Sequence, residues 1–162
     1  MGTPGLKIGH HLADESLHDC AKAAGLNTTI LLVEDNKVQK MACERILQRA
    51  GFAVFCAMDG DQAVCLARDR RPDIILLDIL LPKMSGVQVL QSLQQDGATA
   101  RIPVIVLSAL PQVNEAKLRA LGAVAYFVKS RLFDSKDGES ELLELLARTA
   151  RETREQNTAN AG

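Results

Sequence analysis

The sequence predicts an α/β fold in which a doubly wound, five-stranded parallel sheet of strand order 2-1-3-4-5 carries helices on both faces. Two observations lead to this prediction. From residue 29 onward, short runs rich in β-branched residues alternate with longer amphipathic runs. Most of the short runs are apolar throughout, as expected of strands that are buried on both faces. A chain of 162 residues is also a natural length for one such domain.

The elements follow one another in strict alternation. The predicted strands lie at residues 29–33, 53–56, 74–77, 104–107 and 124–128, and the predicted helices at 37–50, 60–70, from 86 onward, 113–121 and about 140–151. Glycine marks the end of two helices, at Gly51 and Gly122, and Pro72 follows the end of another. Ser85 is the predicted N-cap of the third helix.

Both ends of the chain fall outside this alternation. Residues 1–28 are predicted to form an N-terminal extension with one short helix over 13–24, and residues 29–152 to form the domain itself. Residues 153–162 are polar, so we expect a frayed C-terminal tail. His10, His11, His18 and Cys20 of the extension fit no metal-binding spacing, and we assign no metal to them.

Composition narrows the possible partners. The formal net charge is -1 and aromatic residues make up 3%, which disfavours both a phosphate-neutralising surface and a base-stacking platform. No apolar run reaches the length of roughly 18 residues that a membrane span needs. The four cysteines lack CxxC spacing and are expected to be reduced, packed thiols. We therefore expect a cytoplasmic protein that binds proteins or small anions rather than nucleic acid or membrane.

Charged and hydroxyl side chains stand at the ends of four predicted strands. Glu34 and Asp35 follow the first strand, Asp78 the third, Ser108 the fourth and Lys129 the fifth. In a 2-1-3-4-5 sheet, strands one and three are neighbours, so we expect Asp35 and Asp78 to lie together. Clustered carboxylates require a proton or a cation, and an all-oxygen set favours Mg²⁺, or Mn²⁺ in its place, over zinc. Each of these residues alone would more often be a turn or cap residue, and only the set indicates a site.

The segments TILLVEDN, PDIILLDILLPKMSG, PVIVLSA and GAVAYFVK resemble the signature segments of response-regulator receiver domains of two-component signalling. The resemblance covers roughly residues 29–150 and depends on the ordered set of acidic pair, Asp, Ser, aromatic and Lys. It implies a flavodoxin-like receiver fold, similar to that of single-domain chemotaxis regulators.

The resemblance also implies a role for each site residue. Asp78 matches the phosphorylated aspartate, and Asp35 matches the direct metal ligand. Glu34 matches the carboxylate that reaches the metal through water, and the backbone carbonyl of Leu80 matches a further contribution to the metal shell.

The remaining matches concern the phosphoryl group and the response to it. Ser108 matches the hydroxyl that hydrogen-bonds the phosphoryl group, and Lys129 matches the lysine that pairs with it. Ser108 and Tyr126 together match the switch pair, in which the hydroxyl moves toward the phosphate and the aromatic ring packs into the vacated space.

The implied function is a phosphoacceptor signalling domain that promotes only its own phosphorylation and dephosphorylation, not an enzyme acting on a separate substrate. Asp78 would take a phosphoryl group from a histidine kinase or histidine phosphotransfer protein in a Mg²⁺-dependent reaction. The surface formed by helix 4, strand 5 and helix 5 would then signal to a downstream protein, in a monomer or a weak phosphorylation-dependent dimer.

Two alternatives remain open at this stage. The first is that the chain is the receiver fragment of a larger regulator or hybrid kinase, and the second is that it is a flavodoxin-like or phosphatase-like enzyme of the same layout. The second alternative is disfavoured because Leu80 stands where haloacid-dehalogenase phosphatases carry a second Asp, and because no Gly-rich loop follows the first strand.

The sequence departs from the family pattern after the lysine. Ser130 stands where the family usually has a proline in a cis peptide, and a non-proline cis bond costs about 2.5–4 kcal/mol. The connection over residues 131–140 is also longer than usual. The conformation of this segment is therefore left open by the sequence.

Overall fold

The sheet has the predicted composition and order. The computed structural model describes residues 27–109 and 115–161, and the predicted helix at 13–24 and the histidines of the extension lie outside that range. The strands are β1 (Thr29–Val33), β2 (Ala53–Ala57), β3 (Ile74–Asp78), β4 (Val104–Ser108) and β5 (Ala125–Val128). They pair in parallel in the order β2-β1-β3-β4-β5, which confirms the predicted topology.

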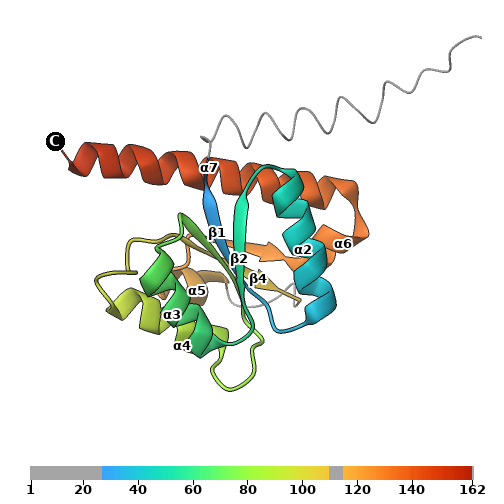
Figure 1. Cartoon of the computed structure of the whole chain (residues 1–162), viewed down its shortest axis with the longest axis horizontal. Helices are drawn as coiled ribbons and strands as arrows, with labels where there is room; N and C mark the ends of the chain where they lie inside the picture. Colours follow the sequence, from blue (N-terminus) through green and yellow to red (C-terminus); the bar gives the residue numbers. More distant parts are fainter. Residues whose placement is uncertain (1–26, 110–114, 162) are drawn as a thin grey trace, which may run out of the picture.

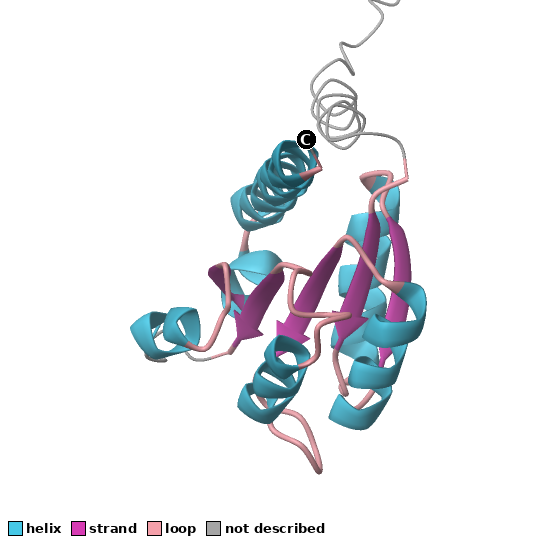
Figure 2. Ribbon diagram, turned by 90° about the vertical axis from the view of Figure 1, so that its left-hand side faces the viewer, coloured by secondary structure: helices cyan, strands magenta, loops and turns pink. Residues whose placement is uncertain are grey.

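Helices cover both faces of this sheet (Figures 1 and 2). They are α2 (Lys37–Arg49), α3 (Gly60–Arg70), α4 (Gly86–Gln95), α5 (Glu115–Ala120), α6 (Lys129–Asp134) and α7 (Lys136–Asn160). Buried residues of α2, α6 and α7 pack on one face of the sheet, and those of α3, α4 and α5 pack on the other. Successive strand residues alternate between the two layers, as Ile30 and Leu31 do in β1.

Polar caps fix the starts of the helices near the carboxyl edge of the sheet. The Asn36 side chain accepts hydrogen bonds from the backbone N–H groups of Val38 and Gln39, and so begins α2 directly after the acidic pair. Ser85 begins α4 with a reciprocal capping box that includes Gln88, as the predicted N-cap required.

Two expectations about the C-terminal part were wrong. The last helix was predicted to begin at about residue 140, but α6 begins at Lys129 and only Ser135 separates it from α7, so residues 131–140 are almost entirely helical. The Ser135 hydroxyl accepts a hydrogen bond from the backbone N–H of Gly138 and so caps the start of α7. The peptide after Lys129 is trans, since the described residues contain no cis peptide bond.

The predicted frayed tail at residues 153–162 is helical as far as Asn160. This end of α7 is polar, so it has no apolar periodicity to reveal it. Hydroxyl groups of Thr153 and Thr158 instead donate to the carbonyls one turn earlier, each at 2.9 Å. The Arg154 guanidinium donates to the Thr28 hydroxyl at 3.1 Å, which ties this part of α7 to the start of β1.

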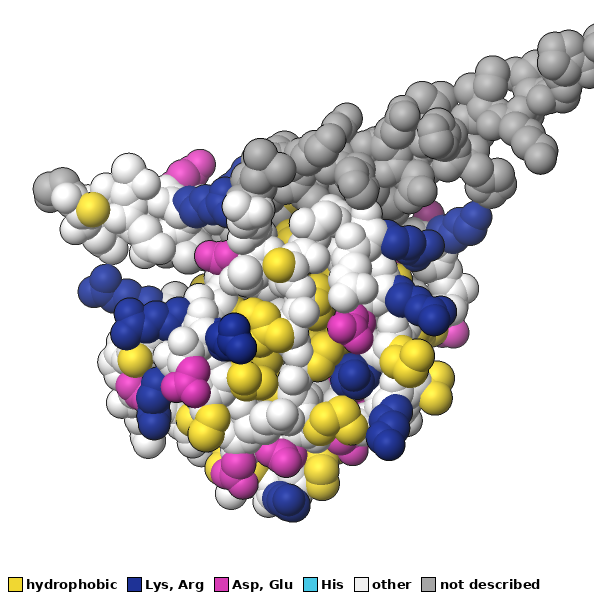
Figure 3. All heavy atoms as spheres, viewed as in Figure 1, with side chains coloured by type: hydrophobic (Ala, Val, Ile, Leu, Met, Phe, Trp, Pro, Cys, Tyr) yellow, Lys and Arg dark blue, Asp and Glu magenta, His cyan; other side chains and the backbone are white. Residues whose placement is uncertain are grey.

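The outer surface mixes charges of both signs. On the face shown in Figure 3, Lys and Arg side chains are interspersed with Asp and Glu side chains and with hydrophobic ones. Among the described residues, no helix is both long enough and apolar enough to cross a membrane.

Candidate functional site

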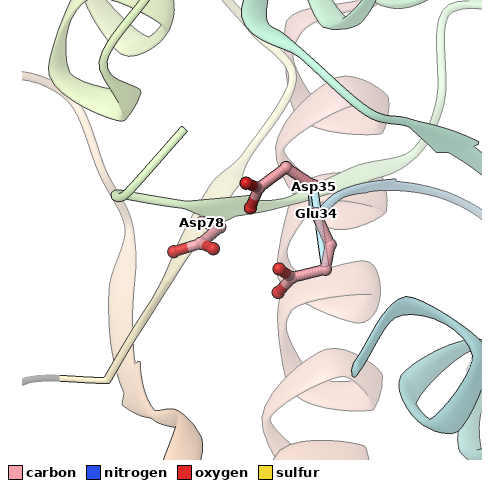
Figure 4. A group of neighbouring side chains, drawn as sticks. All are labelled: Glu34, Asp35 and Asp78. Carbon is pink, nitrogen blue, oxygen red and sulfur yellow. The ribbon is translucent and has the colours of Figure 1, made fainter. Parts of the chain in front are cut away.

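The strand register brings the predicted acidic residues to one place. Val33 of β1 pairs with Leu77 of β3, so Glu34 and Asp78, which each follow by one residue, are neighbours at the carboxyl edge. Glu34 and Asp78 are buried, with exposed fractions of 2% and 4%, whereas Asp35 is exposed. Figure 4 shows the three carboxylates grouped at this edge, and one oxygen from each lies within 4.8 Å of the others.

Lys129 enters the same cluster from the far strand. Its Nζ donates to Asp78 Oδ2 at 2.9 Å, forms an ion pair with Glu34 Oε2 and donates to Gln39 Oε1 at 2.9 Å. The lysine is 7% exposed and is the first residue of α6, directly after β5. The structure therefore brings together Glu34, Asp78 and Lys129, with Asp35 at the solvent side.

Burial and pairing shift the proton affinities of this cluster. Burial raises the pKa of Glu34 above its ordinary value, although hydrogen bonds from Lys129 and from the Asn36 backbone oppose the shift. Burial alone would lower the pKa of Lys129, but its hydrogen bonds to Glu34 and Asp78 outweigh burial and raise that pKa. The lysine is therefore held as an ammonium ion.

Backbone N–H groups complete the coordination of the carboxylates. The Leu80 N–H donates to Asp78 Oδ1 and the Asn36 N–H donates to Glu34 Oε1, each at 3.1 Å. Both oxygens of Asp78 thus already accept a hydrogen bond, one from Leu80 and one from Lys129. The contact that the structure shows for Leu80 is made by its amide, and the role expected for its carbonyl stays a prediction.

Gly86 allows the loop after Asp78 to fold tightly against the start of α4. The Gly86 N–H donates to the Ile79 carbonyl at 3.0 Å. A Cβ atom at residue 86 would lie 2.6 Å from both the Asp78 carbonyl oxygen and the Ile79 Cα. Only glycine fits there without displacing the backbone of the acidic residue.

Ser108 and Tyr126 lie on the two strands next to this cluster. Ser108 is fully buried at the end of β4, where the preceding residue, Leu107, pairs with Asp78. Tyr126 is half-buried in β5, opposite Val106, and packs against the layer under α3, α4 and α5. Ser108 lies at the strand end predicted for it and Tyr126 lies inside the fifth strand, while their role as a switch stays a prediction.

Gln39 is the site residue that the sequence analysis missed. It lies in the first turn of α2, and helical side chains tilt toward the N-terminus of their helix, so it reaches back to the strand ends. Its signal was weak because an uncharged residue inside an amphipathic helix does not stand out among the strand-end residues.

Comparison with known proteins decides the family. The sequence profile of the response regulator receiver domain matches residues 30–136. The chain belongs to this family. The predicted response-regulator receiver domain and its flavodoxin-like fold are thereby confirmed, and the family assignment favours a signalling domain over the phosphatase-like or flavodoxin-like enzyme.

Two curated relatives of this receiver domain differ in length. The polar-differentiation response regulator DivK of Brucella anthropi is 34% identical over 102 residues, which are 62% of this chain and 83% of DivK. The DNA-binding dual master transcriptional regulator RpaA of Synechocystis is 35% identical over 122 residues, which are 75% of this chain but only 50% of RpaA. The chain thus spans about half the length of the second relative.

Solved receiver structures superpose on the chain. The receiver domain of the sensor histidine kinase PA1611 from Pseudomonas aeruginosa is 31% identical, covers 76% of this chain and 98% of its own, and has a TM-score of 0.67. That structure holds a magnesium ion in its active-site cleft. The Mn²⁺-bound response regulator Rcp1 is 26% identical, with a TM-score of 0.59 over 72% of this chain and 89% of its own.

Proposed function

We propose that this receiver domain is a phosphorylation-driven switch in which Asp78 accepts a phosphoryl group from a histidine kinase or histidine phosphotransfer protein. The observation that carries the proposal is the buried Asp78 carboxylate, which is bonded to the Lys129 ammonium beside two further carboxylates. Such a carboxylate is a nucleophile with a cationic group already placed for the oxygens of an incoming phosphoryl group.

The charge of the cluster fits a divalent cation. Three carboxylates face one ammonium, so a net negative charge remains at a largely buried edge. Glu34, Asp35, Asp78 and the Leu80 carbonyl offer oxygen ligands only, which is the donor set of Mg²⁺ or Mn²⁺. The bound ion would supply neutralisation of the phosphoryl oxygens. The metal-bound neighbours PA1611 and Rcp1 support this assignment.

The transfer itself needs little from the chain beyond positioning. An Asp78 carboxylate oxygen attacks phosphorus, and the new O–P bond forms as the P–N bond to the donor histidine breaks and the imidazole leaves. The Lys129 ammonium then exchanges its hydrogen bond to Asp78 Oδ2 for one to a phosphoryl oxygen. The Ser108 hydroxyl donates to a second phosphoryl oxygen. The Leu80 N–H retains its place beside the Asp78 side chain.

The output of the phosphorylated form is a change of surface for a downstream protein. Ser108 moves toward the phosphate and Tyr126 packs into the space it leaves, which favours a second arrangement of the face formed by α5, β5 and the helices after β5. We place the chain in the cytoplasm as a monomer or a weak phosphorylation-dependent dimer, acting on proteins and not on nucleic acid or membrane.

A phosphodonor experiment tests the proposal. The protein is incubated with Mg²⁺ and acetyl phosphate, and the mass gain of one phosphoryl group is compared in wild type, Asp78→Asn and the exposed control Asp61→Asn. We expect the gain in wild type and control and its loss in Asp78→Asn. Phosphate incorporation that persists without the Asp78 carboxylate would contradict the proposal.

A second candidate is the receiver region of a longer regulator or hybrid kinase. The match to RpaA favours it, because the chain corresponds to only half of that protein. The genomic sequence on both sides of the coding segment decides between the two arrangements, and the phosphoacceptor chemistry is the same in both.

A further inference from the structure

The Lys129 ammonium has a third partner that carries no charge. Gln39 Oε1 accepts from Lys129 Nζ at 2.9 Å, across 90 residues of sequence. Gln39 is half-buried in the first turn of α2, and the Asn36 cap that begins this helix fixes the position of that turn. The contact therefore comes from a different element than the strand ends that hold the carboxylates.

The three acceptors match the capacity of the ammonium. A lysine ammonium has three N–H donors and no acceptor. Asp78 Oδ2, Glu34 Oε2 and Gln39 Oε1 supply one oxygen each, which suits a residue that is only 7% exposed. Without the Gln39 amide, one donor of a buried cation would lack its protein partner, which is costly at a desolvated position.

The uncharged nature of the third acceptor has a chemical consequence. A carboxylate at residue 39 would add a fourth negative charge and compete with the phosphoryl group for the lysine. The Gln39 amide instead holds the ammonium near Asp78 with a bond that is weaker than an ion pair. The lysine is thus kept in place and stays available when Asp78 becomes the acceptor.

We propose that Gln39 is a positioning residue for phosphoryl transfer, because its side-chain oxygen holds the Lys129 ammonium beside Asp78. This inference rests on the proposed phosphoacceptor function and adds to it a role for α2. The contact that places Gln39 in the site is its hydrogen bond from Lys129, so its influence on the transfer would pass through the lysine.

The kinetic test removes the acceptor and keeps the shape. Gln39→Met retains the length of the side chain but has no amide oxygen, and Gln48→Met is the matched control on the exposed side of the same helix. With acetyl phosphate and saturating Mg²⁺, we expect Gln39→Met to lower the maximal phosphorylation rate roughly fivefold, which is the factor that corresponds to the net free energy of one hydrogen bond. The half-saturating donor concentration should not change. Gln48→Met should match wild type.

A spectroscopic readout separates positioning from a general loss of structure. The ¹⁵N-labelled ammonium of Lys129 should give a slowly exchanging NH₃⁺ signal in wild type, because its three protons are bonded and buried. The signal should broaden or vanish in Gln39→Met and persist in Gln39→Glu, which keeps an acceptor oxygen at the same length.

The outcomes distinguish the two proposals. If wild type gains no phosphate, the phosphoacceptor function fails. If wild type and Gln39→Met gain phosphate at the same rate, or if their Lys129 signals are alike, only the role of Gln39 is overturned. A rate loss in Gln39→Met that still unfolds in one cooperative transition, together with a lost ammonium signal, supports the positioning role.

Discussion

At the scale of single residues, Lys129 is the cation that offsets two buried carboxylates. It hydrogen-bonds Asp78 and pairs with Glu34, and all three side chains are buried. Removing one partner from such a set leaves uncompensated charge, which is far more costly than the loss of a surface ion pair. The same excess of negative charge should make the vacated site a better cation site.

We therefore expect Lys129→Met to lower the free energy of unfolding by about 3 kcal/mol without divalent ions, and Mg²⁺ to restore more stability to this variant than to wild type. Urea unfolding with and without Mg²⁺ measures both effects, with the exposed Lys136→Met as control. An equal Mg²⁺ effect in both proteins would argue against a shared cation pocket.

The stabilisation by Lys129 also depends on pH. Since the fold raises the pKa of Lys129 above 10.5, its contribution to stability is complete below that pH and is lost as the pH rises through the higher folded value.

Gly86 and Gly97 form a matched pair for testing the loop after Asp78. A Cβ at Gly86 would approach the Asp78 carbonyl oxygen and the Ile79 Cα to 2.6 Å, whereas a Cβ at Gly97 would meet nothing within 4 Å. We expect Gly86→Ala to lose about 1–3 kcal/mol of stability and to slow phosphorylation, because the backbone of Asp78 must shift. Gly97→Ala should be neutral in urea unfolding and in phosphate incorporation, and similar behaviour of the two variants would refute the steric argument.

The residues of the site were predictable to different degrees. Strand order predicted that Asp35 and Asp78 would lie together, because parallel strands end at one edge, whereas the pairing of Lys129 with the site was implied by the family resemblance. The contact of Gln39 with the lysine was not predictable, because it depends on the residue at which α2 begins and on the tilt of its first turn. Such a contact depends on how the helix packs against the sheet, and the spacing of charged residues in the sequence does not reveal it.

At the scale of elements, the close packing of α6 on α7 depends on one glycine. A Cβ at Gly138 would lie 1.8 Å from the Arg131 carbonyl oxygen, so the first turn of α7 could not stay where it is. We expect Gly138→Ala to cost about 1–3 kcal/mol in urea unfolding, despite the better helix propensity of alanine. A gain in stability would show that the two helices separate readily.

The elements that the sequence analysis missed share a cause. Strands and most helices were found because their apolar residues recur with a fixed period and end at Gly or Pro. Residues 131–140 contain Ser135 and Gly138, which are typical of loops, but here they serve as a helix cap and a close-packing position. The polar end of α7 has no apolar face, and its contacts, such as that of Arg154 with Thr28, are tertiary.

At the scale of the whole molecule, the two apolar layers on either side of the sheet should unfold as one unit, and Cys43 reports on one of them. Cys43 lies on the buried face of α2 and is 3% exposed, and burial raises the pKa of its thiol from 9.0 to about 12. Because the folded thiol binds its proton more tightly than the unfolded one, this contribution to stability is complete below about pH 9 and is lost as the pH rises toward 12.

Alkylation at pH 8, followed by peptide mass mapping, should thus label the exposed Cys65 at once and Cys43 only across the urea unfolding transition. Both thiols lie in helices, so the comparison isolates burial from local structure. Labelling of Cys43 in native protein as fast as that of Cys65 would mean that the layer under α2 opens independently of the rest.

Because α6 begins at Lys129, the backbone of this lysine is linked through two successive helices to the C-terminal end of the described chain. Its backbone belongs to a helix that is joined through Ser135 alone to α7, a rod of 25 residues and so about 37 Å long. A tilt of about 5° at the lysine end of such a rod displaces its tip by about 3 Å. A rearrangement at the charged edge that tilted the C-terminal helix would therefore move its polar end the most.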